Sequence, residues 1–231
     1  MKNELSRKIY NTKTIKNMEK RIKLLGVSSK MDAITFLNLR LFTSIILFFI
    51  TIYIFNLGYV LGPIITIIYY YLCSYLLITR PIKKRTSKLE NEAMHFFEVL
   101  TLSLETGKNL NEAFIVTVNT VDNELSNQFK EALREVKYGK SLTEALVSIQ
   151  QNIPSETINN TILTLTQADV FGNSVVDTMY NQIDYLREKK KLEVKASISK
   201  VPIKISVISV LFFVPLILLL ILSPILISYL K

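Results

Sequence analysis

Apolar residues in the central part of the chain recur every three or four positions, which is the period of an amphipathic α-helix. The pattern predicts six helices between residues 89 and 186. Their apolar stripes are Leu89, Ala93, Phe96, Leu100 and Leu104; Leu110, Phe114 and Val118; Leu125, Phe129, Ala132 and Val136; Leu142, Leu146 and Ile149; Ile158, Ile162 and Leu165; and Val176, Met179, Ile183 and Leu186. No stretch alternates long enough to predict a strand. Because the links are short, we expect an all-α fold with an antiparallel six-helix bundle.

A short polar phrase, present in three copies, marks links between these helices. Its glycine closes one helix, its Asn or Ser caps the next, and its acid completes a capping box. The copies begin at Gly107, Gly139 and Gly172, which are 32 and 33 residues apart. The predicted turn and cap residues are Gly107, Asn109 and Glu112; Gly139, Ser141 and Glu144; and Gly172, Ser174 and Asp177. This repeat predicts a compact bundle of helical hairpins, in which capping accounts for the chemistry of the residues.

Two long uncharged runs flank the bundle. Residues 41–79 contain 39 residues without a charge. A straight helix of that length would measure about 58 Å, against a hydrocarbon core of about 30 Å. We therefore expect two transmembrane spans, 38–57 and 60–79, with a turn marked by Asn56, Gly58, Gly62 and Pro63. Residues 205–230 form a second uncharged run of 26 residues, which predicts a third transmembrane helix within 203–231, bent at Pro215 and Pro224.

The N-terminal arm, residues 1–37, has a different pattern. Ile15, Met18, Ile22 and Leu25 form one apolar stripe among lysines and arginines. A basic amphipathic helix just before a span is expected to lie on an anionic leaflet, whereas the alternative is a solvated charged arm. The predicted organisation is thus arm 1–37, hairpin 38–79, bundle 80–202 and third span 203–231.

The net charge of +9 is unevenly distributed. Residues 1–40 carry +7, whereas residues 80–202 hold sixteen charges of each sign. The excess therefore flanks the apolar segments, as expected at a membrane surface, and does not favour nucleic-acid binding. Because the predicted turn of the hairpin lacks Lys and Arg, both ends of the hairpin and the bundle are expected to be cytoplasmic, with the C-terminus outside.

Residues 89–186 contain fourteen acidic and five basic residues, which gives this segment a net charge of −9. Residues 80–88 and 187–202 at the two ends of the domain carry +5 and +4. Such an acidic body favours a basic partner. The alternative is an ordinary soluble surface with a nonzero charge.

Candidate catalytic chemistry is scarce. Cys73 is the only cysteine and has apolar neighbours, so we expect a buried or lipid-facing thiol. His95 is the only histidine and lies in a helical pattern, where a structural or surface role is expected. The Gly-Lys pairs at 107 and 139 lack the upstream glycine of a phosphate-binding loop. The predicted spans carry no interior charge of the kind that marks a transport pathway. These observations predict a protein without catalytic residues, metal or cofactor.

The three turns, the apolar spacing between them and the flanking uncharged segments resemble the F domain of type II secretion and type IV pilus systems. The phrase Gly-Lys-Ser-Leu-Thr-Glu-Ala-Leu at 139–146 carries much of this likeness, which covers roughly residues 20–231. The chain looks most similar to the inner-membrane platform proteins of tight-adherence (Tad/Flp) pili. Members of that family often have a further span after this one.

The resemblance implies a non-enzymatic scaffold in the inner (cytoplasmic) membrane that couples a cytoplasmic secretion ATPase to pilin extraction and assembly. Its implied partners are that ATPase, pilin subunits, membrane lipids and either a paralogous platform protein or further copies of itself. The alternative is a membrane-anchored helical adaptor or sensor that binds a signalling partner. A small channel or enzyme is a third, weaker possibility.

Overall fold

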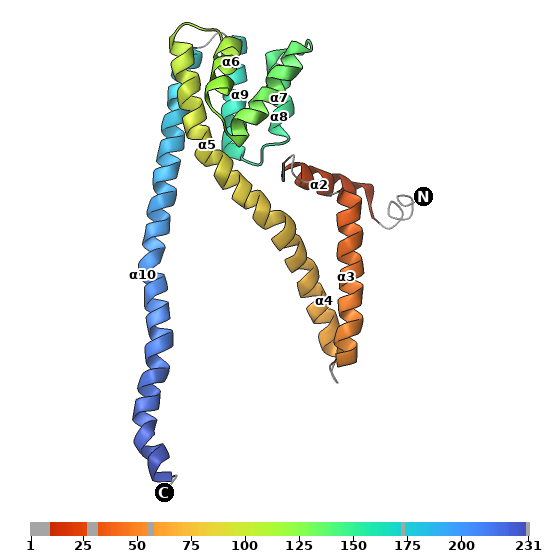
Figure 1. The fold of residues 1–231 in the computed structure, drawn as a ribbon, viewed down its shortest axis with the longest axis vertical. Coiled ribbons are helices and arrows are strands. Elements are labelled where there is room, and N and C mark those ends of the chain that lie inside the picture. The colour runs from red at the N-terminus through yellow and green to blue at the C-terminus, as the bar shows by residue number, and fades with distance from the viewer. Residues whose placement is uncertain (1–9, 27–31, 55–57, 172–173, 230–231) are drawn as a thin grey trace. The chain divides into compact units, whose positions relative to one another are not determined.

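The computed structural model describes residues 10–26, 32–54, 58–171 and 174–229, and these segments are helical apart from their connections (Figure 1). The chain divides into two compact units, 1–182 and 183–231. Three helical stretches, Ala33–Ile54, Tyr59–Glu105 and Val175–Leu222, are long and apolar enough to cross a membrane. The all-α prediction and the expectation of three candidate spans are therefore confirmed.

In the first unit, α3 (Ala33–Ile54) packs along α4 (Gly58–Ser74) as a helical hairpin (Figure 1). Large apolar side chains cover its outer surface, as expected for a surface facing lipid. The expected turn was too long, because Gly62 and Pro63 lie inside α4, while Asn56 falls outside the described residues. A Cβ atom at Gly62 would lie 3.2 Å from Thr51 Oγ1, so this glycine serves the close approach of two helices.

The hairpin continues into the bundle without a break. The π-helical turn η1 (Tyr75–Thr79) follows α4, and α5 (Arg80–Glu105) follows η1. The backbone N–H of Arg80 donates to the carbonyl of Tyr75, five residues earlier, which is the π-helical spacing. A single helical path thus runs from the hairpin to the far end of α5.

The bundle core is built around stacked phenylalanines. Its helices after α5 are α6 (Leu110–Thr120), α7 (Glu124–Lys137), α8 (Leu142–Gln150), α9 (Glu156–Phe171) and the start of α10 (Val175–Tyr229). The Phe129 ring stacks on Phe96 at 4.5 Å and on Phe114 at 5.1 Å between centroids, and Phe97 meets Phe129 edge-on. These four side chains are at most 1% exposed. Most residues of the apolar stripes predicted from the sequence therefore lie in the core, whereas Val136, Leu142 and Val176 are only half-buried.

Side-chain caps begin the helices of the bundle. Asn109 Oδ1 accepts from the N–H of Glu112 at 2.9 Å, and Ser174 Oγ accepts from the N–H of Asp177 at 3.2 Å. Ser141 and Glu144 form a complete reciprocal capping box. Asn123, which the repeat did not include, caps α7 by accepting from the N–H of Ser126.

The glycines that precede two of these caps have positive φ, +81° at Gly107 and +98° at Gly139. Side chains rarely adopt that conformation, so each glycine closes the preceding helix at low cost. Gly172, the glycine of the third copy, lies outside the described residues.

The arm forms α2 (Thr12–Lys23), which Asn11 caps, and its apolar stripe is buried within the protein. We call the cluster beneath it the juxtamembrane core. It consists of Ile15, Met18 and Ile22 of α2, Ala33, Phe36 and Leu37 of α3, and Ile78 of η1. Protein therefore covers this apolar stripe, because α3 and η1 supply the surface on which it packs, and the placement of the basic helix on an anionic leaflet stays a prediction.

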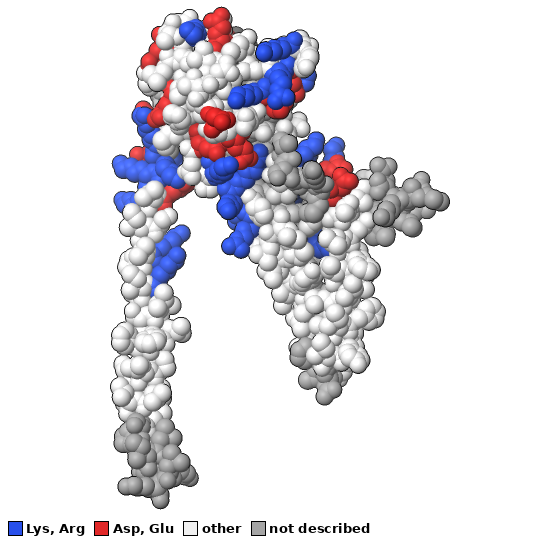
Figure 2. Space-filling view, in the orientation of Figure 1, with Lys and Arg blue, Asp and Glu red and all other residues white. Residues whose placement is uncertain are grey.

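The second unit, residues 183–231, consists of the greater part of α10. The helix continues through Pro202, Pro215 and Pro224 up to Tyr229. Its apolar part and the lower part of the hairpin are surfaces without Lys, Arg, Asp or Glu (Figure 2). Side chains between 205 and 222 are exposed almost throughout, as expected for a helix that meets lipid or partner helices.

Candidate functional site at the junction of arm, hairpin and bundle

The described residues contain no group of three or more His, Cys, Asp or Glu that could hold a metal ion. Cys73 is a half-buried free thiol on α4, and His95 is exposed on α5. The candidate functional features are the contacts that join different parts of the molecule.

Arg85 on α5 is the centre of such contacts, and it is only 8% exposed. Its Nε donates to Glu124 Oε1 on α7 at 2.6 Å. Its Nη1 donates to two main-chain carbonyls, Leu24 at the end of the arm and Asn152 in the α8–α9 link, each at 2.7 Å. We call these four residues the junction. One buried guanidinium thus ties the arm and two parts of the bundle to the helix that rises from the hairpin.

Glu124 is the acidic partner in the junction, and α7 places it in its first turn. Lys88 Nζ lies 3.0 Å from its second carboxylate oxygen. Partial burial alone would raise the pKa of Glu124, but hydrogen bonds from Arg85 and Lys88 outweigh this and hold the pKa below its ordinary value. The carboxylate is therefore charged at neutral pH.

Gly26 allows the arm to approach Arg85. Its φ is +94°, and a Cβ atom there would lie 3.0 Å from Arg85 Nε and 3.2 Å from Cζ. Both the backbone conformation and the missing side chain are needed at this position. Gly26, three residues after the end of α2, therefore leaves room for the guanidinium that donates to the Leu24 carbonyl.

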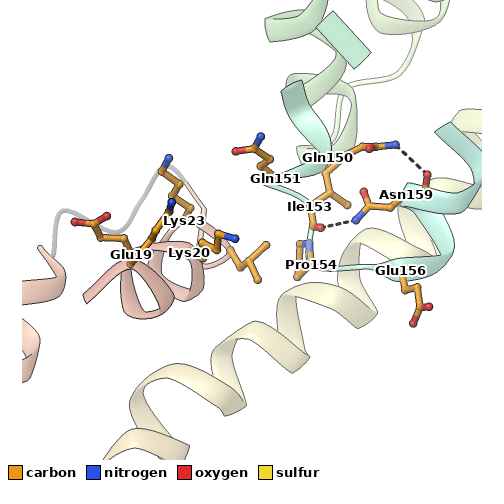
Figure 3. A pocket seen from close by; sticks show the side chains of 11 residues that line it. Glu19, Lys20, Lys23, Gln150, Gln151, Ile153, Pro154, Glu156 and Asn159 are labelled. Carbon is orange, nitrogen blue, oxygen red and sulfur yellow. Dashed lines mark hydrogen bonds between the residues drawn. The ribbon is translucent and has the colours of Figure 1, made fainter. Parts of the chain in front are cut away.

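A pocket of about 680 Å³ opens between α2 and the α8–α9 link (Figure 3). On the α2 side it is lined by Lys16, Glu19, Lys20 and Lys23; on the bundle side its walls include Gln150, Ile153 and Asn159. Gln150 Nε2 donates to the Asn159 carbonyl, and Asn159 Nδ2 donates to the Ile153 carbonyl, each at 3.1 Å. These bonds fix the bundle wall, while exposed lysines form the other side. The arrangement suits binding rather than catalysis.

A second buried arginine lies inside the hairpin. Arg40 of α3 is 8% exposed, and its guanidinium lies 3.9 Å from the centroid of the Tyr70 ring on α4. It also donates to the Tyr70 hydroxyl, and the Tyr10 hydroxyl donates to the nearby Leu37 carbonyl. The expectation that the predicted spans carry no interior charge is therefore wrong for α3, where Arg40 fixes the helix to α4.

The cap residues predicted from the sequence do not gather into one site. They lie at separate helix ends, and the described ones form local bonds within their own turns. The junction was missed, because Arg85 is one of five basic residues between 80 and 88 and its partners are 39 to 67 residues away. No periodic pattern in the sequence marks residues so far apart as partners.

The family model described as "Type II secretion system (T2SS), protein F" matches residues 96–224, which is more than half of the chain. No match was found among curated proteins, and none among solved structures.

Proposed function

Because the chain belongs to the type II secretion system protein F family, whose members are non-enzymatic platform proteins of secretion and pilus machines, we propose that it is the platform of a tight-adherence (Tad/Flp) pilus machine. In this role it couples a cytoplasmic secretion ATPase to the extraction of pilin subunits from the membrane. The repeated Gly-x-Asn/Ser turns and the uncharged flanking segments support the Tad/Flp assignment.

The observation that carries this proposal is the junction. A platform without its own energy source must pass a displacement from the bundle to the spans. Arg85 bonds the helix that leaves the hairpin to α7 and to the α8–α9 link, so movement of the bundle is passed to the hairpin at this point. The unbroken path from Tyr59 to Glu105 adds stiffness to the same connection.

The long α10 supplies a second connection, because it runs as one helix from Val175 to Tyr229. A flexible Gly-Ser segment inserted beside Ser197 interrupts it without touching the bundle core. We expect this insertion to leave ATPase binding intact and to abolish pilus assembly, scored by electron microscopy of cells. A conservative Ser197→Ala change is the control. Normal assembly with the insertion would exclude the lever role.

The acidic surface of residues 89–186 is the proposed binding face for the ATPase. We expect the purified protein to hydrolyse no ATP but to bind the cognate ATPase, with affinity that falls as salt is added, since the attraction joins exposed charges. Pull-down at increasing salt concentration measures this. Complete absence of binding would favour the alternative of a membrane-anchored adaptor or sensor for a signalling partner.

The proposed location is the inner membrane, with the arm and bundle cytoplasmic and the C-terminus outside. The basic residues that flank the hairpin support this orientation. Reporter fusions at Asn56, Asn127 and Lys231 test it, and we expect an external, a cytoplasmic and an external signal. An external Asn127 would overturn the orientation. Pilin subunits, a paralogous platform protein or further copies of the chain are the proposed partners within the membrane.

A further inference from the structure

A second pocket, with a volume of about 580 Å³, is lined by Arg85 and its neighbours on α5 and α7. Its charged lining comes from Lys84, Arg85 and Lys88 of α5 and from Glu124 of α7. Three bases thus face one acid, whose oxygens already bond Arg85 and Lys88. The excess positive charge suits an anionic ligand.

Arg85 has donor capacity left for such a ligand. Its Nε and Nη1 are used within the junction, but Nη2 has no hydrogen-bond partner in the part of the chain that the structure describes. A buried cationic N–H without an acceptor is costly, and phosphate oxygens are favoured acceptors for guanidinium groups. Gly26 lines the same pocket, and a Cβ there would lie 3.4 Å from Nη2. The nitrogen that lacks a partner is thus itself buried, and the missing side chain of Gly26 leaves space beside it.

The position of the pocket along α5 selects the source of the phosphate. The uncharged run ends at Thr79, and Lys84 lies four residues beyond Arg80. At 1.5 Å per residue this is about 6 Å, within the headgroup layer of about 5–8 Å on each side of the hydrocarbon core. We propose that this pocket binds the phosphate of an anionic phospholipid headgroup, with Arg85 Nη2 and Lys84 as its donors. The proposal rests on the membrane placement given under Proposed function, but not on the ATPase or pilin partners.

Lipid could bind in a specific site or be attracted generally to a basic surface. Two neighbouring lysines allow these two kinds of binding to be distinguished. Lys83 and Lys84 are adjacent, exposed and equally charged, but only Lys84 lines the pocket. The test uses the full-length protein purified in mild detergent, with bound phosphatidylglycerol counted by native mass spectrometry during titration. We expect Lys84→Gln to lower the affinity about fivefold and Lys83→Gln to change it less than about twofold. Equal losses in the two variants would overturn the site.

Two further measurements identify the ligand. Phosphatidylcholine, which carries a phosphate but no net charge, is expected to bind more weakly than phosphatidylglycerol. Inorganic phosphate in excess is expected not to displace phosphatidylglycerol; full displacement would instead indicate a site for soluble phosphate and overturn the lipid assignment. Because lipid retention is measured without ATPase or pilin, failed pilus assembly with normal retention would contradict the platform role alone. If Lys84→Gln lost bound phosphatidylglycerol but assembled pili normally, the lipid site would be supported, and it would have no role in assembly.

Discussion

The bundle core and the juxtamembrane core are built in different ways. Four phenylalanines from α5, α6 and α7 fill the centre of the bundle, with each ring at most 1% exposed. The juxtamembrane core consists of seven mostly aliphatic side chains from three separate segments, and its α2 members Ile15 and Ile22 keep 9% exposure. An aromatic stack buries more area and packs with specific geometry. The smaller core is therefore expected to depend more on polar bonds.

The difference suggests a division of labour. The bundle is stabilised by its own interior, whereas the docking of the arm also requires the Arg85 bond to the Leu24 carbonyl. A platform has use for both properties, because a stiff body moves as a unit and a less stable contact at its base can open. Local stabilities of this kind differ within one chain and can be measured separately.

Removing a ring from the bundle core is expected to have the largest effect. Phe129 contacts Phe96, Phe97 and Phe114, so Phe129→Ala leaves a cavity and should cost about 3–5 kcal/mol. Hydrogen exchange of the protein in detergent should show lost protection across α5–α9. Leu102→Ala, at a position 61% exposed on α5, is the control and should change little. Equal effects would contradict the placement of the core.

Arg85→Met tests the juxtamembrane core and should cost about 2–3 kcal/mol, because it removes the Arg85 donor of the Leu24 and Asn152 carbonyls and leaves the Glu124 carboxylate with Lys88 alone. Exchange should accelerate in α2, while α6 and the core of α9 keep their protection. Arg80→Met removes an exposed charge one and a half turns earlier and should leave α2 unchanged. If Arg85→Met instead unfolded the bundle, the two cores would not be independent.

Ser141→Ala removes the capping box of α8 and should destabilise the bundle by about 0.5–2 kcal/mol. Gly139→Val should cost more than the serine change, because a β-branched side chain fits a φ of +98° badly. Exchange in α7 and α8 measures both, and α2 should be unaffected by either. Unchanged protection in both variants would show that the turn does not depend on these residues.

Acid should loosen the arm, and this effect is expected to be the smallest. The pKa of Glu124 is lowered in the folded protein, so its contribution is present above the ordinary value of about 4.3 and is lost as the pH falls through the lowered pKa. Spin labels at Lys13 and Gln151 in a Cys73→Ser background should report a wider distance distribution at low pH. Glu124→Gln should widen it already at neutral pH.

The matched control for this titration is Glu135→Gln. Bonds from Lys140 and Ser148 lower the pKa of Glu135, which lies on the bundle surface away from the arm. Its replacement should leave the distance distribution between the arm and the bundle unchanged at every pH. A change as large as that in Glu124→Gln would assign the acid effect to the bundle instead of the junction.

Periodicity and turn chemistry were sufficient to predict the helices and most of the buried stripe residues, because both depend on neighbours close in sequence. The face that Ile15, Met18 and Ile22 bury was also predictable, but the surface that covers them was not. An amphipathic pattern specifies an apolar face without specifying whether protein or lipid meets it. The role of Arg85 was equally hidden, since a bond between residues 61 positions apart leaves no periodic trace.

The sequence predicts a turn at Gly62 and Pro63, but both residues lie inside α4. This prediction also used only neighbours close in sequence. Local preference favours a break there, but Gly62 faces Thr51 and Phe48 of the neighbouring helix. Contact between helices had more weight than local preference. Sequence reasoning is therefore strongest for elements and weakest for what joins them.

The π-helical turn at Tyr75–Thr79 takes up one residue more than an α turn on the path between the hairpin and the bundle. Each residue of an α-helix advances the side-chain direction by about 100°, so deleting one residue from the α-helical stretch between Arg80 and Arg85 would rotate Arg85 by about that angle relative to α4. Deleting one residue from the π turn would instead let it close as an α turn, with the helices on both sides close to their present phase. Ile78 packs within the turn and Arg85 bonds after it, so only the second deletion is expected to leave both near their partners. The extra residue of this turn is therefore a place where the length of the path can change without turning Arg85 away from the junction.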